Sequence, residues 1–112
     1  MKLSKNIVIV GAKRTAFGAM QGGFLSYAGD SSGNGIIFAS HTQKNGGTDG
    51  TYEAGRLWAF DAGTLRRLWA STDVTWRDDL GVFGKFSPPT VANGRVYVAT
   101  FSGAVAVYGL LY

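Results

Sequence analysis

Two stretches of the chain repeat one pattern of residues. Residues 34–40 (NGIIFAS) and 93–99 (NGRVYVA) each place an Asn-Gly pair before an apolar run with an aromatic residue in it. Residues 55–60 (GRLWAF) are likewise similar to residues 103–108 (GAVAVY). The spacing within the first copy is longer, which an extended loop at residues 41–54 explains. The simplest interpretation is two copies of one supersecondary unit.

Each copy is predicted to be an antiparallel meander of short strands. Asn-Gly between apolar runs is a strong hairpin signal, because both residues accept the positive φ of a type I′ turn. Residues 71–87 are polar and contain glycine, so we expect a loop between the two units. The predicted strands cover residues 23–28, 35–41, 56–61 and 65–70 in the first unit, and 88–93, 95–100 and 104–109 in the second.

The composition agrees with an all-β fold. The chain has 17 glycines against two prolines, and seven Phe, five Tyr and three Trp, which suits short strands joined by tight turns. Hydrophobic residues make up 46% of the sequence and charged residues 16%, so the chain is globular rather than disordered. No stretch shows a sustained 3.6-residue period.

The predicted strands are apolar on both faces. In residues 95–100, Val96 and Val98 point to one side, while Tyr97 and Ala99 point to the other. Such a sheet must be covered on both faces, as in a β-propeller, where sheets stack around an axis. The alternative is a two-sheet sandwich, in which each sheet buries one face only.

Residues 56–69 (RLWAFDAGTLRRLW) resemble the repeat of quinoprotein-type β-propellers, with Ala59, Asp61, Thr64 and Trp69 at matching places. Leu65 stands where that repeat usually has glycine, so the turn is expected to differ locally. Residues 87–109 resemble the last blade, and the resemblance covers residues 23–112. It implies that the Trp packs between blades and that the Asp holds the turn.

The first 23 residues resemble a different family. Residues 5–24 (KNIVIVGAKRTAFGAMQGGF) are similar to the N-terminus of bacterial acetyl-CoA acetyltransferases (thiolases). The matching residues are Gly11, Arg14, Thr15, Phe17 and Gly18, and Ala16 replaces a common proline. We therefore expect a chimera, natural or engineered, with a thiolase-like segment at 1–22 and a two-blade fragment at 23–112 that together form one compact domain.

The net charge of +4 is located in the N-terminal segment. Residues 1–22 hold four basic residues and no acid, whereas basic and acidic residues balance in 23–112. A nucleic-acid groove needs basic residues spread along a face, so no nucleic-acid partner is expected. The apolar run at residues 7–10 is too short for a signal peptide or a membrane span, so we expect no membrane partner and a cytoplasmic location if the chain is expressed as written.

Neither parent chemistry is expected to survive, so the chain is predicted not to be an enzyme. Thiolases need a nucleophilic cysteine activated by histidine, but the chain has no cysteine and His41 is its only histidine. A thiolysis assay should therefore show no turnover above the buffer control. Quinoprotein catalysis needs a complete ring of blades around the cofactor, a calcium ion and an Asp base, and two blades cannot enclose that cavity.

Smaller groups of residues give no site, so no catalytic, cofactor-binding or metal-binding residue is predicted. Residues 30–35 (DSSGNG) imitate the start of a calcium loop, but the twelfth place is His41 instead of Glu, which favours a turn. Asp78 and Asp79 are neighbours whose side chains point apart. His41 is expected in a loop or at the surface. Residues 11–18 lack the glycine spacing of a phosphate-binding loop.

The sequence thus predicts an all-β protein of two propeller-like four-stranded antiparallel meanders, without cofactors and with itself as partner. The second meander shows three strands, and residues 6–10 (NIVIV), of which the last four are β-branched, are suited to be the fourth, in their own chain or a neighbour's. A homo-oligomer, either a closed ring or a swapped dimer, is expected. The alternatives are a propeller fragment that binds a cofactor or carbohydrate, and an acetyltransferase by N-terminal resemblance only.

Overall fold

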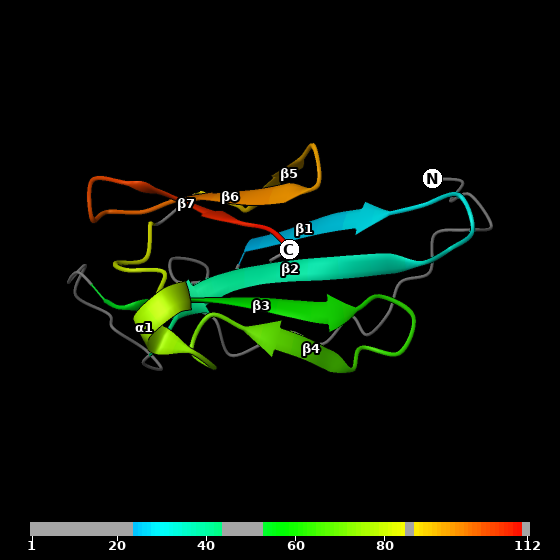
Figure 1. The fold of residues 1–112 in the computed structure, drawn as a ribbon, viewed down its shortest axis with the longest axis horizontal. Coiled ribbons are helices and arrows are strands. Elements are labelled where there is room, and N and C mark those ends of the chain that lie inside the picture. Colours follow the sequence, from blue (N-terminus) through cyan, green and yellow to red (C-terminus); the bar gives the residue numbers. More distant parts are fainter. Residues whose placement is uncertain (1–23, 44–52, 85–86, 111–112) are drawn as a thin grey trace.

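The computed structural model describes residues 24–43, 53–84 and 87–110 of the protein. They form seven strands and one short helix, arranged as two separate sheets (Figure 1). The elements are β1 (Phe24–Gly29), β2 (Gly35–Thr42), β3 (Gly55–Asp61), β4 (Arg67–Ala70), α1 (Thr75–Asp78), β5 (Thr90–Ala92), β6 (Arg95–Ala99) and β7 (Val105–Tyr108).

Both sheets are antiparallel meanders, which confirms the predicted all-β class. The larger sheet has the order β1-β2-β3-β4 and the smaller one the order β5-β6-β7. The first unit therefore has the four strands expected of it. The fourth strand expected for the second unit, residues 6–10, lies outside the described residues, as do the N-terminal segment 1–22 and residues 11–18.

The turns follow from their residues. Asn93 and Gly94 both have positive φ angles, 51° and 71°, so β5 and β6 are joined by the predicted type I′ turn. Asp61 ends β3 and holds the next turn, because its Oδ1 accepts hydrogen bonds from the backbone of Gly63 (2.9 Å) and Thr64 (2.8 Å) and from the Thr64 hydroxyl (2.9 Å).

Three predicted boundaries need correction. The strand expected from residue 65 begins at Arg67, because Leu65 is in the left-handed region (φ 60°) and belongs to the turn. The strand expected from residue 88 begins at Thr90, because Pro88 and Pro89 have no N–H for the ladder. Residues 71–87, predicted as a loop, contain the helical turn α1.

The segment between the units also joins the two sheets. Isolated bridges pair Val82 with Ala54 and Phe83 with Thr100, so this segment contacts the residue before β3 and the residue after β6. The backbone N–H of Gly55 donates to the carbonyl of Gly81 at 2.7 Å. A side chain at Gly55 would lie 2.8 Å from Leu80, so the close approach requires glycine there.

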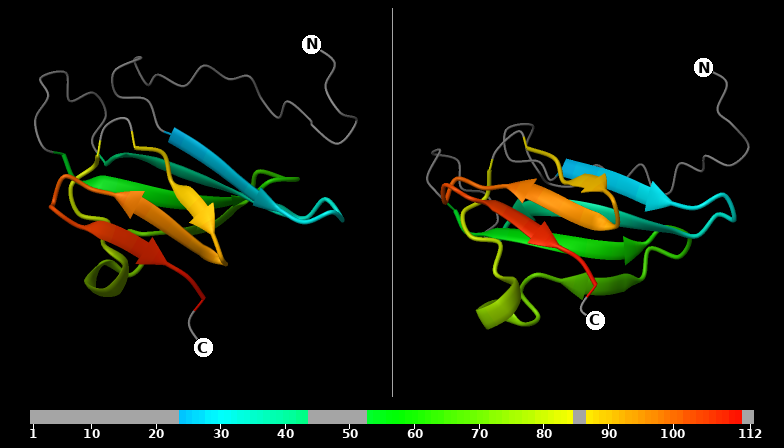
Figure 2. Two further views of the ribbon diagram at one scale, coloured as in Figure 1. Left: turned by 90° about the horizontal axis from the view of Figure 1, so that it is seen from above. Right: turned by 45° about the horizontal axis from the view of Figure 1, so that its top comes forward.

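The core lies between the two sheets, which pack face to face (Figure 2). Its fully or almost fully buried side chains come from β3, β6 and the connecting segment: Leu57, Leu80, Val96 and Val98. Partly buried side chains from both sheets surround them: Phe38, Trp69, Val91, Ala106 and Tyr108. Each fully buried aliphatic side chain contributes about 1.5 to 3 kcal/mol, so this layer holds the sheets together.

Candidate functional site

The side of the four-stranded sheet that faces away from the core carries an apolar and aromatic surface. Strand register places its members on one side of the sheet, and Leu25 (66%) and Tyr27 (61%) are its most exposed apolar side chains. We call this surface the outer face of the four-stranded sheet. Its apolar side chains are Leu25, Tyr27, Ile37, Ala39, Trp58 and Phe60, and the same register adds the polar side chains of His41, Arg56 and Arg67.

Trp58 is at the centre of a stack on this outer face. Its ring lies parallel to His41 (centroids 6.1 Å apart, 14° between planes) and to Phe60 (5.8 Å, 23°). The guanidinium groups of Arg56 and Arg67 lie 5.0 and 5.3 Å from the Trp58 ring centre, within cation–π range. Together these contacts hold the indole in place.

His41 has a structural role in this stack. It lies half-buried in β2, which corrects the expectation of a loop or surface position. The Trp58 indole N–H donates to Nε2 of His41, and Nδ1 lies against the carbonyl of Thr42. Burial lowers the pKa of His41, and the nearby Arg56 charge acts in the same direction. The imidazole therefore stays neutral at physiological pH.

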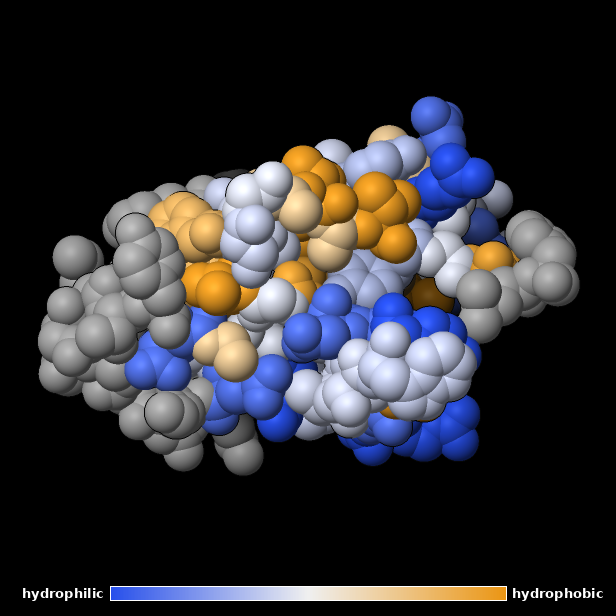
Figure 3. Space-filling view, turned by 60° about the vertical axis from the view of Figure 1, so that its left-hand side comes forward, coloured by the Kyte–Doolittle hydropathy of each residue, from blue (hydrophilic) through white to orange (hydrophobic). Residues whose placement is uncertain are grey.

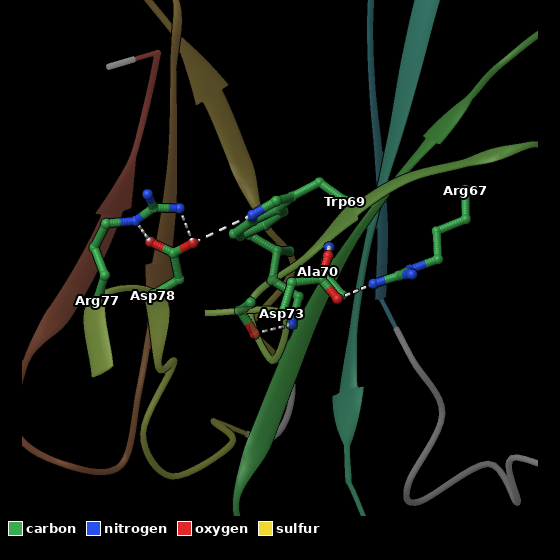
Figure 4. Close-up of polar contacts among 8 residues, drawn as sticks. Arg67, Trp69, Ala70, Asp73, Arg77 and Asp78 are labelled. Atoms are coloured by element: carbon green, nitrogen blue, oxygen red, sulfur yellow. Dashed lines mark hydrogen bonds and ion pairs between the residues drawn. The ribbon is translucent and has the colours of Figure 1, made fainter. Parts of the chain in front are cut away.

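A second polar cluster joins the two sheets beside α1 (Figure 4). The Arg77 guanidinium donates two hydrogen bonds of 2.6 Å to the Asp78 carboxylate, and the Trp69 indole N–H donates to the same carboxylate at 3.3 Å. These hydrogen bonds, chiefly that from Arg77, lower the pKa of Asp78. The Asp78 carboxylate thus stays ionised and has a structural role, and nothing in its geometry supports general acid–base catalysis together with Asp79.

Tyr108 completes the connection from the other sheet. Its hydroxyl donates to the backbone carbonyl of Asp78 at 3.0 Å, and its ring meets Trp69 edge-on at 5.3 Å. Burial, together with the negative charges of Asp79 and Asp78, raises the pKa of Tyr108 to about 12. The phenol therefore remains a neutral donor far above physiological pH.

An apolar groove of about 780 Å³ opens between the sheets at this place. Leu68 and Trp69 of β4 line one side, and Tyr108 and Leu110 at the end of β7 line the other. Phe38 is part of its apolar lining. The described residues of β7 pair with β6 only, so the groove lies along a free strand edge.

The candidate calcium loop is a turn. Oδ1 of Asp30 accepts hydrogen bonds from the backbone N–H groups of Ser32 (2.9 Å) and Asn34 (3.0 Å), and Oδ2 accepts one from the Asn34 amide (3.0 Å). These bonds, chiefly that from the Asn34 side chain, lower the pKa of Asp30. Across the part of the chain that is described, no three His, Cys, Asp or Glu side chains cluster to hold a metal ion.

Sequence reasoning found Asp61 and Trp69 but missed the Trp58 stack and the groove. Both depend on which strand faces meet, and a one-dimensional pattern does not carry that information. Within the described residues, no helix has the length and hydrophobicity to cross a membrane. No family model, curated protein or solved structure matches the chain.

Proposed function

We propose that this chain is a non-catalytic β module whose property is association with itself. The observation that carries the proposal is the exposure of apolar side chains on the outer faces of both sheets. Val105 (58%), Val107 (51%) and Phe101 (51%) are exposed on and beside the three-stranded sheet, as Leu25 and Tyr27 are on the other. An antiparallel sheet that faces water normally carries polar residues on that side.

The apolar side chains are gathered rather than scattered. Figure 3 shows hydrophobic side chains across the upper part of the molecule, at the height of the three-stranded sheet, above a largely hydrophilic lower part. Contiguous apolar surface of this kind usually marks an association site. Association is favoured over catalysis also because His41, Asp78 and Asp30 are each engaged in structural hydrogen bonds.

Each sheet, in this proposal, is one propeller-like blade, and residues 6–10 supply the fourth strand of the second blade. The support is the free edge of β7 within the described residues and the apolar groove beside it. An unpaired edge exposes backbone N–H and C=O groups and is usually covered. Four of the five residues of the 6–10 segment are apolar and β-branched, as suits a covering strand.

Size-exclusion chromatography coupled to light scattering tests the proposal. At tens of micromolar the full chain should elute as a species of at least twice the 11.9 kDa monomer mass. Dilution should shift the species toward the monomer unless the assembly is very tight. A monodisperse 11.9 kDa protein at these concentrations would overturn the proposal and favour a compact two-sheet sandwich.

The groove favours one second function, the binding of a cofactor or carbohydrate as in the propeller family that the sequence resembles. Trp69 and Tyr108 provide aromatic rings on its walls, and Arg77, Asp78 and Arg95 provide polar groups. Such a mixture of aromatic walls and few polar groups is typical of small-molecule sites. Calorimetric titration with calcium and the quinone cofactor of quinoproteins should show saturable heat if this function is correct. It should show none if residues 6–10 fill the groove as a strand.

A further inference from the structure

The two sheets are copies of one unit, but equivalent residues lie on opposite sides of them. In the repeated segment, Ile37 corresponds to Val96 and Phe38 to Tyr97. Phe38 packs against the core, whereas Tyr97 is on the outer face of its sheet. Val96 is buried (6% exposed), whereas Ile37 is on the outer face.

The second repeated segment follows the same rule. Leu57 is fully buried and its equivalent Val105 is 58% exposed, while Ala59 is 6% exposed and its equivalent Val107 is 51% exposed. The reverse holds for the alternate positions. Trp58 lies on the outer face, and its equivalent Ala106 packs against the core.

The first strands of the two units agree with this pattern. Tyr27 pairs with Ile37, and Val91 pairs with Val96, so Tyr27 and Val91 are equivalent. Val91 packs against the core, whereas Tyr27 is 61% exposed. All three pairs of strands thus give one relation between the units: the second sheet turns toward the first the face that is equivalent to the outer face of the first.

This relation makes the two free surfaces complementary to each other. The outer face of the three-stranded sheet, defined by Thr90, Tyr97, Ala99, Val105 and Val107, is equivalent to the buried face of the four-stranded sheet. The outer face of the four-stranded sheet is equivalent to the buried face of the three-stranded sheet. Each free surface therefore occupies the repeat position of one half of an interface that the molecule already contains, with different side chains at several places.

We propose that a second copy of the chain packs head to tail on the first, with the outer face of the four-stranded sheet of one copy against the outer face of the three-stranded sheet of the next. The inference rests on the proposed self-association and specifies its geometry. A heterologous contact of this kind closes into a ring or continues as a filament, and it differs from a two-fold dimer, in which one surface meets itself.

The outer face of the four-stranded sheet is shaped for such a contact. The Tyr27 ring lies over the backbone of Gly29 and Gly35, where a Cβ at Gly35 would come 2.4 Å from the ring. The Trp58 indole is held in place by the nearly parallel rings of His41 and Phe60. Large side chains held in place in this way can pack against a second sheet, whose mean plane would lie about 10 Å away.

Two single substitutions test the geometry. Val107→Lys places a charge on the outer face of the three-stranded sheet, and Tyr27→Lys places one on the outer face of the four-stranded sheet. Both positions are more than half exposed, so the fold should tolerate the change, and circular dichroism with thermal melting checks this. Leu25→Lys, at a 66% exposed position, replaces Tyr27→Lys if the latter fails to fold. Trp76→Lys, at an 86% exposed position in α1, is the control and should leave the mass unchanged.

Head-to-tail packing predicts that each variant alone is monomeric by light scattering, because every contact needs one surface of each kind. An equimolar mixture of the two variants should form a 1:1 dimer, because each retains the surface that the other lacks. If one variant assembles like the unmodified chain, or if the mixture stays monomeric, the head-to-tail inference is wrong while self-association stands. If the unmodified chain is itself monomeric, the proposed function has failed.

Discussion

Leu65 adopts a backbone conformation that residues with a bulky side chain avoid. Its φ of 60° closes the turn between β3 and β4, in a place where the resembled repeat has glycine. The left-handed region costs a non-glycine residue about 1 to 2 kcal/mol, and glycine's greater freedom in the unfolded chain offsets about half of this. Leu65→Gly should therefore raise the free energy of unfolding by about 0.5 to 1 kcal/mol.

Urea unfolding measures this effect, and Leu65→Ala is the matched control. Alanine removes the same 43% exposed side chain but keeps the Cβ that makes the conformation costly, so it should bring no gain. A glycine variant no more stable than the alanine variant would show that the turn is not strained.

Tyr108 should dominate the response of the fold to alkaline pH. Its pKa is about 12 in the folded protein against 10 in the unfolded chain, so folding favours the neutral phenol. The resulting stabilisation is fully present below pH 10 and is lost as pH rises through about 12. Tyr108→Phe should flatten the fall in stability over this range, and should cost about 1 kcal/mol at pH 7 for the lost hydrogen bond to Asp78.

Stability measured by urea unfolding from pH 7 to 11.5 tests this expectation. The unmodified protein and Tyr108→Phe should converge as pH rises. Parallel curves, with the same loss in both proteins, would assign the alkaline transition to other groups.

At the scale of single residues, hydrogen bonds within a turn were predictable from the sequence, and contacts between side chains on neighbouring strands were not. Asp61 and Asp30 hold their own turns through bonds to residues two to four positions away, so a short sequence window contains the whole interaction. His41 depends on Trp58, which lies on the next strand and is brought close only by the pairing of His41 with Arg56. No sequence window contains that contact.

At the scale of elements, the strands were predictable because each has its own turn signals. Asn93-Gly94 forms the expected turn before β6, whereas before β2 the positive φ belongs to Gly33 (87°) and Gly35 already begins the strand. The strand boundaries agree within about one residue, except at the starts of β4 and β5. The exceptions have local physical causes in Leu65 and in Pro88 and Pro89. The helix α1 has four residues, too few to show a helical period in the sequence.

Trp69 connects β4 to the second sheet and should be the most sensitive aromatic position among the three tryptophans. It packs against the core, meets Tyr108 edge-on and donates to Asp78. Because the side chain is only partly buried, Trp69→Ala should lower the free energy of unfolding by about 2 kcal/mol, less than for a fully buried tryptophan.

Denaturant unfolding followed by far-ultraviolet circular dichroism measures the change. Trp76→Ala, which removes the same side chain at an 86% exposed position, is the control and should stay within about 0.5 kcal/mol of the unmodified protein. Equal losses from both substitutions would contradict the assigned role of Trp69.

At the scale of the molecule, residues 6–10 are proposed to complete the second sheet on the free edge of β7. Removal of residues 1–11 should then lower the melting temperature or change the oligomeric state, because the edge and the groove lose their cover. Differential scanning calorimetry and light scattering measure both effects. A truncated chain that melts and elutes like the full one would show that the segment is a tail.

The direction in which the units stack could not be predicted from the repeat. The sequence shows which residues are equivalent, and side-chain alternation shows which of them share a face. Neither observation says which face of the first unit meets which face of the second. That information appears only when Phe38 is found in the core and its equivalent Tyr97 outside it.

Disulfide cross-linking tests head-to-tail stacking most directly. The chain has no native cysteine, so every disulfide must come from the introduced residues. Within the molecule, Ser26 of β1 bonds to the Pro89 carbonyl. The equivalents of Ser26 and Pro89 are Thr90 and Leu25, so stacking places Thr90 of one copy beside Leu25 of the next. The double variant Leu25→Cys/Thr90→Cys should form a ladder of covalent oligomers under mild oxidation, while each single variant stays monomeric on a non-reducing gel. Covalent dimers from a single variant, with no ladder from the double variant, would contradict head-to-tail stacking.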